Sequence, residues 1–211
     1  MGGAKFGREM RLEGKHEGEL AQARETIVRF LRKRFAPKSL RQIESALEAV
    51  DSLELLSELL DRAVDCNRLT EFRKVLPVPR DTAAHTTSEV KQQKTVDSRV
   101  ADALSLLNLF SEMAYPRFNV AAIIGKDKLR ESKFARSMRF EGQQEGRLEQ
   151  ARAGIIYFLH KRFGLKVLAD IESTLAELDS LESLKALLDR AVDCCSLAAF
   201  RKEVPTPSRQ R

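Results

Sequence analysis

Few residues in this chain of 211 have both the type and the spacing that catalysis or phosphate binding requires. Gly125-Lys126 matches the end of a phosphate-binding loop. However, Val120 occupies the position of the first glycine of such a loop, and Asp127 replaces the serine or threonine that would bind magnesium. The pattern therefore does not predict a nucleotide site.

The histidines and cysteines also lack the spacing of known catalytic or metal sites. No histidine lies in a His-Glu-x-x-His helix, no Gly-x-Ser-x-Gly turn occurs, and the paired cysteine spacing of a zinc site is missing. The residues concerned are His16, His85, His160, Cys66, Cys194 and Cys195. We therefore predict no catalytic residue, no metal site and no cofactor, and we expect Cys66 and Cys194 to be free thiols at a helix end.

A run of cations is the strongest candidate for a binding site. It contains no acidic residue from Thr26 to Ile43 and comprises Arg29, Arg32, Lys33, Arg34, Lys38 and Arg41. Such a cluster can bind the phosphates of a nucleic acid. Cations in the last turn of a helix also stabilise the helix dipole, and this structural interpretation is the one we favour.

Gly14 and Gly18 are four residues apart in a segment with helical periodicity, and Gly142 and Gly146 repeat the pair. A glycine inside a helix costs about 1 kcal/mol relative to alanine. Glycines on one helix face would let another backbone approach closely. The alternative is a flexible start to the helix.

These candidates lie in a sequence that contains the same module twice. Residues 5–79 align without a gap on residues 133–207, and 44 of the 75 paired positions are identical. We expect two helical modules, residues 5–79 and 132–207. Residues 80–97 are polar and are expected to form a flexible linker, residues 98–131 a helical connector, and residues 208–211 a tail.

Apolar residues recur with helical spacing throughout each copy and indicate an all-α fold. Each module should have one long first helix, Phe6–Phe35 or Phe134–Phe163, followed by two or three short helices. Pro37 ends the first long helix, and Gly164 offers a C-terminal cap to the second. A short second helix is expected at 40–50. A third helix should begin with Asp51 as its capping residue, or with Asp179 in the second copy. A fourth is expected near 69–75 and should be capped by Asn67, or by Ser196 in the second copy.

The connector contains a further helix at 98–113, which Tyr115-Pro116 ends. Five of its residues recur at helical spacing and predict the face by which it docks on the rest of the protein: Val100, Ala103, Leu104, Leu107 and Phe110.

Composition narrows the class of protein. The net charge of +6 is spread over both copies, the connecting residues and the tail, so neither module is strongly basic. No apolar stretch approaches the length of a membrane span, and the first residues of the sequence contain no apolar run of the kind that a signal peptide has. Three cysteines are compatible with a reducing compartment, and we expect a cytoplasmic protein without a membrane partner.

Several segments resemble a known family. Glu13-Gly-Lys-His-Glu-Gly18 is followed by Ile27-Val-Arg-Phe-Leu-Arg-Lys-Arg-Phe35, by Ile43-Glu-Ser-Ala-Leu, and by leucines of the third helix. This order is similar to the small helical domain of unknown function that follows the catalytic domain in recombination-promoting nucleases and transposase-like PD-(D/E)XK proteins. His160-Lys-Arg-Phe-Gly164 and Lys128-Leu-Arg-Glu-Ser-Lys-Phe134 resemble that family as well.

The resemblance does not imply an enzyme, because the nuclease domain is missing. A PD-(D/E)XK site needs an aspartate on one strand and a Glu-x-Lys on the next, so that carboxylates hold a metal beside the phosphate. Glu89-Val90-Lys91 is the only tempting match, and it lies in the polar linker without strand patterning. We treat it as a chance match.

We therefore expect a non-catalytic interaction or oligomerisation protein that arose by duplication of such a tail. A long first helix cannot bury its apolar stripe against a few short helices, so it should seek a partner. The partner would be the same chain, as an intramolecular pseudo-dimer or a homodimer, or a related nuclease-like protein. The expected association surface is Leu20, Ile27, Leu31, Leu148, Ile155 and Leu159. A nucleic-acid accessory protein that uses the cation cluster, or a decayed remnant without function, are the alternatives.

Overall fold

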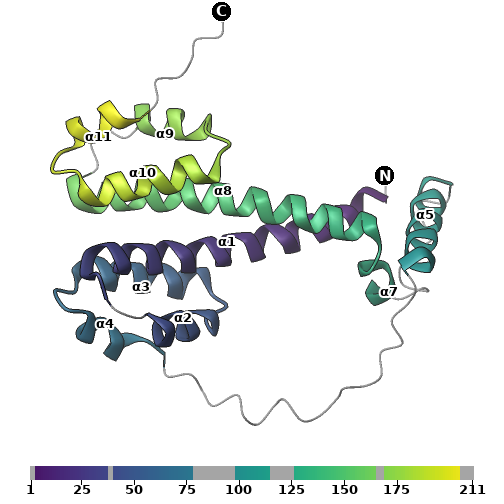
Figure 1. Ribbon diagram of the computed structural model, residues 1–211. Coiled ribbons are helices and arrows are strands. Elements are labelled where there is room, and N and C mark those ends of the chain that lie inside the picture. Colours follow the sequence, from purple (N-terminus) through teal and green to yellow (C-terminus); the bar gives the residue numbers. More distant parts are fainter. Residues whose placement is uncertain (1–2, 38–39, 78–97, 115–125, 165–168, 205–211) are drawn as a thin grey trace, which may run out of the picture. The chain divides into compact units, whose positions relative to one another are not determined.

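The computed structural model describes residues 3–37, 40–77, 98–114, 126–164 and 169–204. Every regular element in these ranges is a helix, which confirms the all-α fold (Figure 1). Among the described helices, none is both long enough and apolar enough to cross a membrane. The expected linker and tail lie outside the described residues, as do the Tyr115-Pro116 helix stop, His85 and the Glu89-Val90-Lys91 segment.

Two long helices dominate the structure, α1 (Gly3–Phe35) and α8 (Lys133–Phe163). Gly164 ends α8 with a φ of 83°, and its amide donates to the carbonyl of His160, so the predicted glycine cap is confirmed. Ala36 occupies the equivalent position after α1 and has a φ of 41°. A side chain in this left-handed region is strained, and Pro37 follows it at once.

Three short helices follow each long helix. After α1 come α2 (Arg41–Glu48), α3 (Leu53–Asp65) and α4 (Leu69–Val75). After α8 come α9 (Ala169–Ala176), α10 (Leu181–Asp193) and α11 (Leu197–Glu203). Each helix of the second set has the bounds of its counterpart shifted by the offset of the sequence repeat.

The caps of the short helices differ in part from the prediction. Ser52 and Ser180 cap α3 and α10 by accepting from the amides of Leu55 and Ser183, so Asp51 and Asp179 are not the capping residues. The two exposed carboxylates instead make ion pairs with Arg24 and Arg152. Leu40 begins α2 without a side-chain cap, and Arg68 rather than Asn67 begins α4. Ser196 caps α11 as predicted.

The described chain divides into two compact units that do not coincide with the two sequence copies. Unit 1 consists of Met1–Gly18 and Asp81–Gly146, and unit 2 of Glu19–Arg80 and Arg147–Arg211. The boundaries fall at equivalent positions within α1 and α8, so each unit combines part of one copy with the matching part of the other. Tertiary contacts therefore join equivalent segments of the two copies.

Unit 2 contains the second halves of α1 and α8 with the short helices. Figure 1 shows α3 beside α1, with α2 and α4 beyond it, and α10 beside α8, with α9 and α11 beyond it. A single apolar core contains residues from every one of these helices. Its fully buried members include Phe72 of α4 and Phe200 of α11, which occupy equivalent positions. The two copies therefore share one core.

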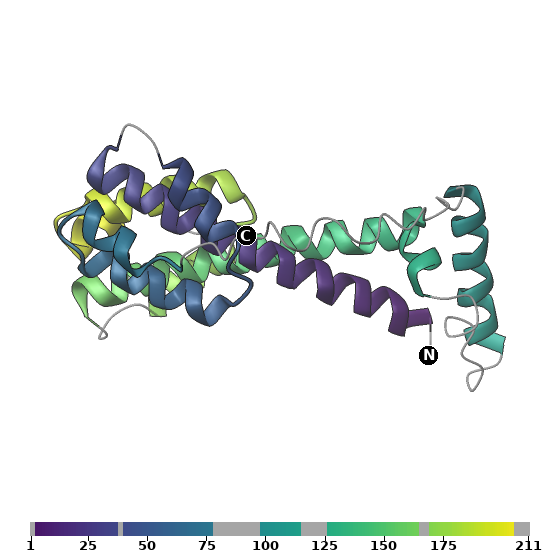
Figure 2. The same cartoon turned by 90° about the horizontal axis from the view of Figure 1, so that it is seen from below.

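Unit 1 contains the first halves of α1 and α8 together with α5 (Ser98–Ala114) and α7 (Lys126–Arg130). Figure 2 shows α5 and α7 beside the start of α8. Asp102 of α5 accepts a 2.6 Å hydrogen bond from the amide of Lys133, the first residue of α8. A small core forms from Phe6, Met10, Leu129 and Ala135, with Leu104 and Met138 packed against it.

The docking face predicted for α5 is wrong. Of the predicted stripe only Leu104 packs against the core, whereas Val100, Ala103, Leu107 and Phe110 are exposed. Among the side chains of α5 whose burial the structure describes, Ala101, Ser105 and Asn108 are buried. Helical periodicity identifies an apolar face, but it does not say that this face is the one turned toward the same chain.

Candidate association surfaces

The six residues predicted as an association surface lie in the core of unit 2. Ile27, Leu31, Ile155 and Leu159 are almost completely buried, Leu20 is buried, and Leu148 is partly buried. All six belong to one apolar cluster, which we call the α1–α8 seam. The rings of Phe30 and Phe158 meet there with centroids 5.5 Å apart. In this structure the surface is therefore used within one chain.

Ion pairs cross from each long helix to the third helix of the other copy. Arg29 of α1 makes two hydrogen bonds to Asp189 of α10, at 2.7 and 2.5 Å. Lys33 pairs with Asp193 at 2.6 Å. The Arg29 hydrogen bonds hold the pKa of Asp189 below its usual range, so the carboxylate stays charged at neutral pH.

The reciprocal contacts run from α8 to α3. Tyr157 and Lys161, the equivalents of Arg29 and Lys33, both donate to Asp61, and Lys161 also pairs with Asp65 at 3.0 Å. The contacts of Arg29 and Lys33 with α10 thus have mates between α8 and α3, with residue numbers shifted by the repeat offset. This is the pattern of a two-fold symmetric dimer, in which every contact has a mate.

The partly buried phenol of Tyr157 gives a titration test of this packing. Burial and the hydrogen bond to Asp61 raise the pKa of Tyr157 to about 12, because both disfavour the phenolate. Its contribution to stability should be present below the ordinary tyrosine pKa of about 10 and be lost as the pH rises toward 12. Because the chain has two tyrosines and no tryptophan, Tyr115→Phe leaves Tyr157 as the sole phenol.

We expect the tyrosinate absorbance of Tyr115→Phe to rise with a midpoint near pH 12. Adding Asp61→Asn should move that midpoint partway toward 10, because the amide lacks the negative charge that opposes ionisation. Circular dichroism at each pH monitors the fold. A midpoint near 10 in folded Tyr115→Phe would show that the phenol is not packed in this way.

The cation cluster is engaged inside unit 2. Besides the pairs of Arg29 and Lys33, Arg32 meets Glu44 at 3.2 Å, and Arg34 donates to the carbonyls of Ala63 and Val64 at the end of α3. Arg162 makes the equivalent bonds at the end of α10. Arg41 also has a partner, and Lys38 lies outside the described residues. These contacts give the cations structural roles.

In unit 1 the two long helices cross at the paired glycines. A Cβ on Gly14 would lie 2.0 Å from the carbonyl oxygen of Arg139, and a Cβ on Gly18 would lie 2.2 Å from that of Gln143. A Cβ on Gly142 would lie 2.0 Å from the carbonyl oxygen of Arg11. The close backbone approach that the glycine spacing predicts is confirmed. The contacts advance in the same direction along both helices, so α1 and α8 are parallel here.

Reciprocal ion pairs flank this glycine crossing. Arg11 donates to Glu145 at 2.9 Å, and its equivalent Arg139 donates to Glu17 at 2.9 Å. Gln143 adds a 2.8 Å hydrogen bond to Glu17. The Arg139 hydrogen bond keeps the pKa of Glu17 below its usual value. The contacts in unit 1 therefore follow the same two-fold pattern as those in unit 2.

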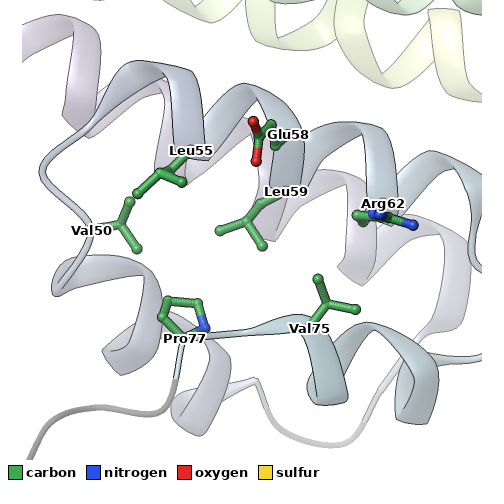
Figure 3. Close-up of a pocket in the computed structure, with 7 residues that line it drawn as sticks. All are labelled: Val50, Leu55, Glu58, Leu59, Arg62, Val75 and Pro77. Atoms are coloured by element: carbon green, nitrogen blue, oxygen red, sulfur yellow. The ribbon is translucent and has the colours of Figure 1, made fainter.

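Unit 2 also carries an apolar hollow of about 240 Å³ on the first copy (Figure 3). Its walls are Val50, Leu55, Leu59, Val75 and Pro77, with Glu58 and Arg62 among its lining residues. Leu55 and Val75 are about half exposed. Ligand pockets usually occupy about 300–1,000 Å³, so this hollow suits a single apolar side chain of another protein better than a cofactor.

The second copy has different residues at the equivalent positions. Ser183 stands in place of Leu55 and Glu203 in place of Val75. These changes remove apolar groups that the first copy exposes. The apolar lining at these two positions is thus specific to the first copy.

Within the described ranges, no group of three or more His, Cys, Asp or Glu residues is arranged to hold a metal ion. Cys66, Cys194 and Cys195 are free thiols. Burial raises the pKa of Cys66 and of Cys194, and each thiol donates to a carbonyl one turn earlier in its own helix. Their surroundings disfavour the reactive thiolate and fit packing roles.

Sequence reasoning missed the acidic partners of the cations, chiefly Asp61, Asp65, Asp189 and Asp193. They lie on α3 and α10, about a hundred or more residues away along the chain from the cations that they neutralise. A signal was present, because the aspartates recur at the same two positions of both copies. Interpreting this recurrence as a set of ion pairs requires the assumption that the two copies pack on each other.

No family model, curated protein or solved structure matches this chain.

Proposed function

We propose that the chain is a non-catalytic helical association protein, related to the tail of transposase-like PD-(D/E)XK nucleases. In this proposal its two copies pair with each other inside one chain. The observation that carries it is the reciprocity of the cross-copy contacts, Arg29 with Asp189 and Tyr157 with Asp61. Tandem duplication of a module that dimerises would convert a two-chain symmetry into this single-chain form.

The engaged cations favour association over the alternative of nucleic-acid binding. Phosphate contacts need basic side chains that can release counterions on binding. Arg29, Lys33 and Arg34 are instead bonded to carboxylates or helix-end carbonyls of unit 2. Binding a phosphate would first require these bonds to break.

The experiment compares two ligands under the same conditions. The full chain is titrated with a PD-(D/E)XK protein that carries one such tail, with the same nuclease lacking its tail as control, and with a short DNA duplex. We expect binding of the tailed protein that changes little between about 50 and about 200 mM salt. Tight DNA binding that falls steeply over this interval would favour the accessory-protein alternative, and binding of neither ligand would favour a decayed remnant.

A further inference from the structure

The helix α5 exposes several large apolar side chains, although it buries Ala101 and packs Leu104 against the core of unit 1. Val100, Leu107 and Phe110 are 50%, 55% and 62% exposed, whereas the polar residues Ser105 and Asn108 are buried. The buried hydroxyl of Ser105 has no hydrogen-bond partner. A surface helix normally turns its apolar stripe toward the protein and its polar residues toward water. Exposed apolar residues gathered on one helix face are typical of a surface that binds another protein chain.

The spacing of the exposed face is that of a helix-pairing surface. Val100, Ala103, Leu107, Phe110 and Ala114 are all exposed and follow steps of three and four, the a and d positions of two heptads. Leu106 lies beside them and is also exposed. None of these six residues is ionisable, so two copies of the stripe can meet without like-charge repulsion. We call them the α5 stripe.

We propose that the α5 stripe binds the α5 stripe of a second copy of this chain, as an antiparallel pair. The sizes of its side chains favour this orientation. In an antiparallel pair centred between Leu106 and Leu107, the large Phe110 of each copy lies opposite the small Ala103 of the other. A parallel pair would set Phe110 against Phe110 and leave a gap between the two alanines. This inference rests on the association role proposed above and deepens it by naming the surface.

The exposed area sets the expected strength of the pair. The four large side chains of the stripe each expose on the order of 100 Å², so about 800 Å² would be buried over both copies. This is below the roughly 1,200 Å² of a standard stable interface. The dimer should therefore be transient and form as the concentration rises through the micromolar range.

The first test is the mass of the full chain by sedimentation equilibrium at increasing concentration. The mass should rise from the monomer value of 23.9 kDa toward twice that value. Leu107→Glu should shift the midpoint at least about tenfold in concentration, because it places two like charges at the centre of the pair. Leu12→Glu is the matched control, because Leu12 is 59% exposed but lies on α1, outside the α5 stripe. It should leave the midpoint unchanged.

Cross-linking tests the orientation in a background with the three cysteines replaced by serine. Leu107→Cys should form a disulfide-linked dimer with copper phenanthroline, because the two thiols lie near the centre of the pair. Val100→Cys should not, because its two copies would be about 20 Å apart along the pair. A thiol at position 107 that resists alkylation in a monomer would show that the stripe is covered within the chain. That result, or a monomer at every concentration, overturns the proposal, even if the tailed nuclease binds as proposed above.

Discussion

The double variant Ile27→Asp with Ile155→Asp should unfold unit 2. The two isoleucines are 1% and 0% exposed and belong to the core that all the helices of this unit share. An unpaired carboxylate in such surroundings costs several kcal/mol, and two of them approach the 5–15 kcal/mol by which a whole domain is stabilised. We expect loss of most of the helical circular dichroism of unit 2 at temperatures where the wild type is folded.

Leu12→Asp with Phe140→Asp is the matched control. These residues also occupy equivalent positions on α1 and α8, but they are 59% and 60% exposed. The control adds the same two charges, and we expect its melting temperature to stay within a few degrees of the wild type. If the isoleucine variant keeps the wild-type melting temperature and the wild-type mass by light scattering, the seam does not hold unit 2 together.

The local structure followed from the sequence because it depends on local signals. Periodicity and breaking residues predict α4 at its observed bounds, and Gly164 marks the end of α8 because glycine adopts a positive φ without strain. The cap of α3 was misplaced by one residue, since Asp51 and Ser52 are both good caps. In the structure Ser52 caps the helix, and Asp51 pairs with Arg24, which is distant in sequence.

The exposed face of α5 and the limits of the two compact units could not be predicted in the same way. The stripe of α5 was recognised as apolar, yet the side that docks is the one with Ala101 and Asn108. A periodic pattern carries no information about which partner covers a face. The limits of the compact units could not be predicted for the same reason. The units end at Gly18 and Gly146 because the two copies pack on each other, and the sequence of one copy does not show this packing.

The chemistry of the cation cluster was ambiguous for a related reason. The sequence around Arg29 and Lys33 has no acidic residue from Thr26 to Ile43, which is typical of phosphate binding as well as of a helix C-terminus. Their partners, Asp189 and Asp193, come from the other copy. A charge count over a local window therefore overstates the free positive charge, because folding neutralises it from a distant segment.

Gly14→Ala should separate the long helices in unit 1. The new Cβ would lie 2.0 Å from a backbone carbonyl oxygen on α8, and backbone cannot rotate away as a flexible side chain can. The helices must move apart by more than an ångström, and the ion pairs that flank the crossing would be stretched. Overpacking of this kind costs about 3 kcal/mol, although alanine is the better helix former by about 1 kcal/mol. Faster hydrogen exchange in peptides from Met1–Gly18 and from 133–146 would report it.

Gly154→Ala makes the same chemical change at a mid-helix glycine of α8. Its effect on stability should have the opposite sign to that of Gly14→Ala. Its Cβ would meet only Thr26, at 3.5 Å, beside a cavity of about 140 Å³ that Tyr157 also lines. A methyl group fits there, so the variant should gain up to about 1 kcal/mol from helix propensity and show slower exchange in unit 2. Opposite changes in stability would distinguish the effect of the helix crossing from that of helix propensity, because propensity alone would make both variants more stable. Equal stabilisation of Gly14→Ala and Gly154→Ala would mean that α1 and α8 do not touch at Gly14, and the two-fold pairing in unit 1 would have to be abandoned.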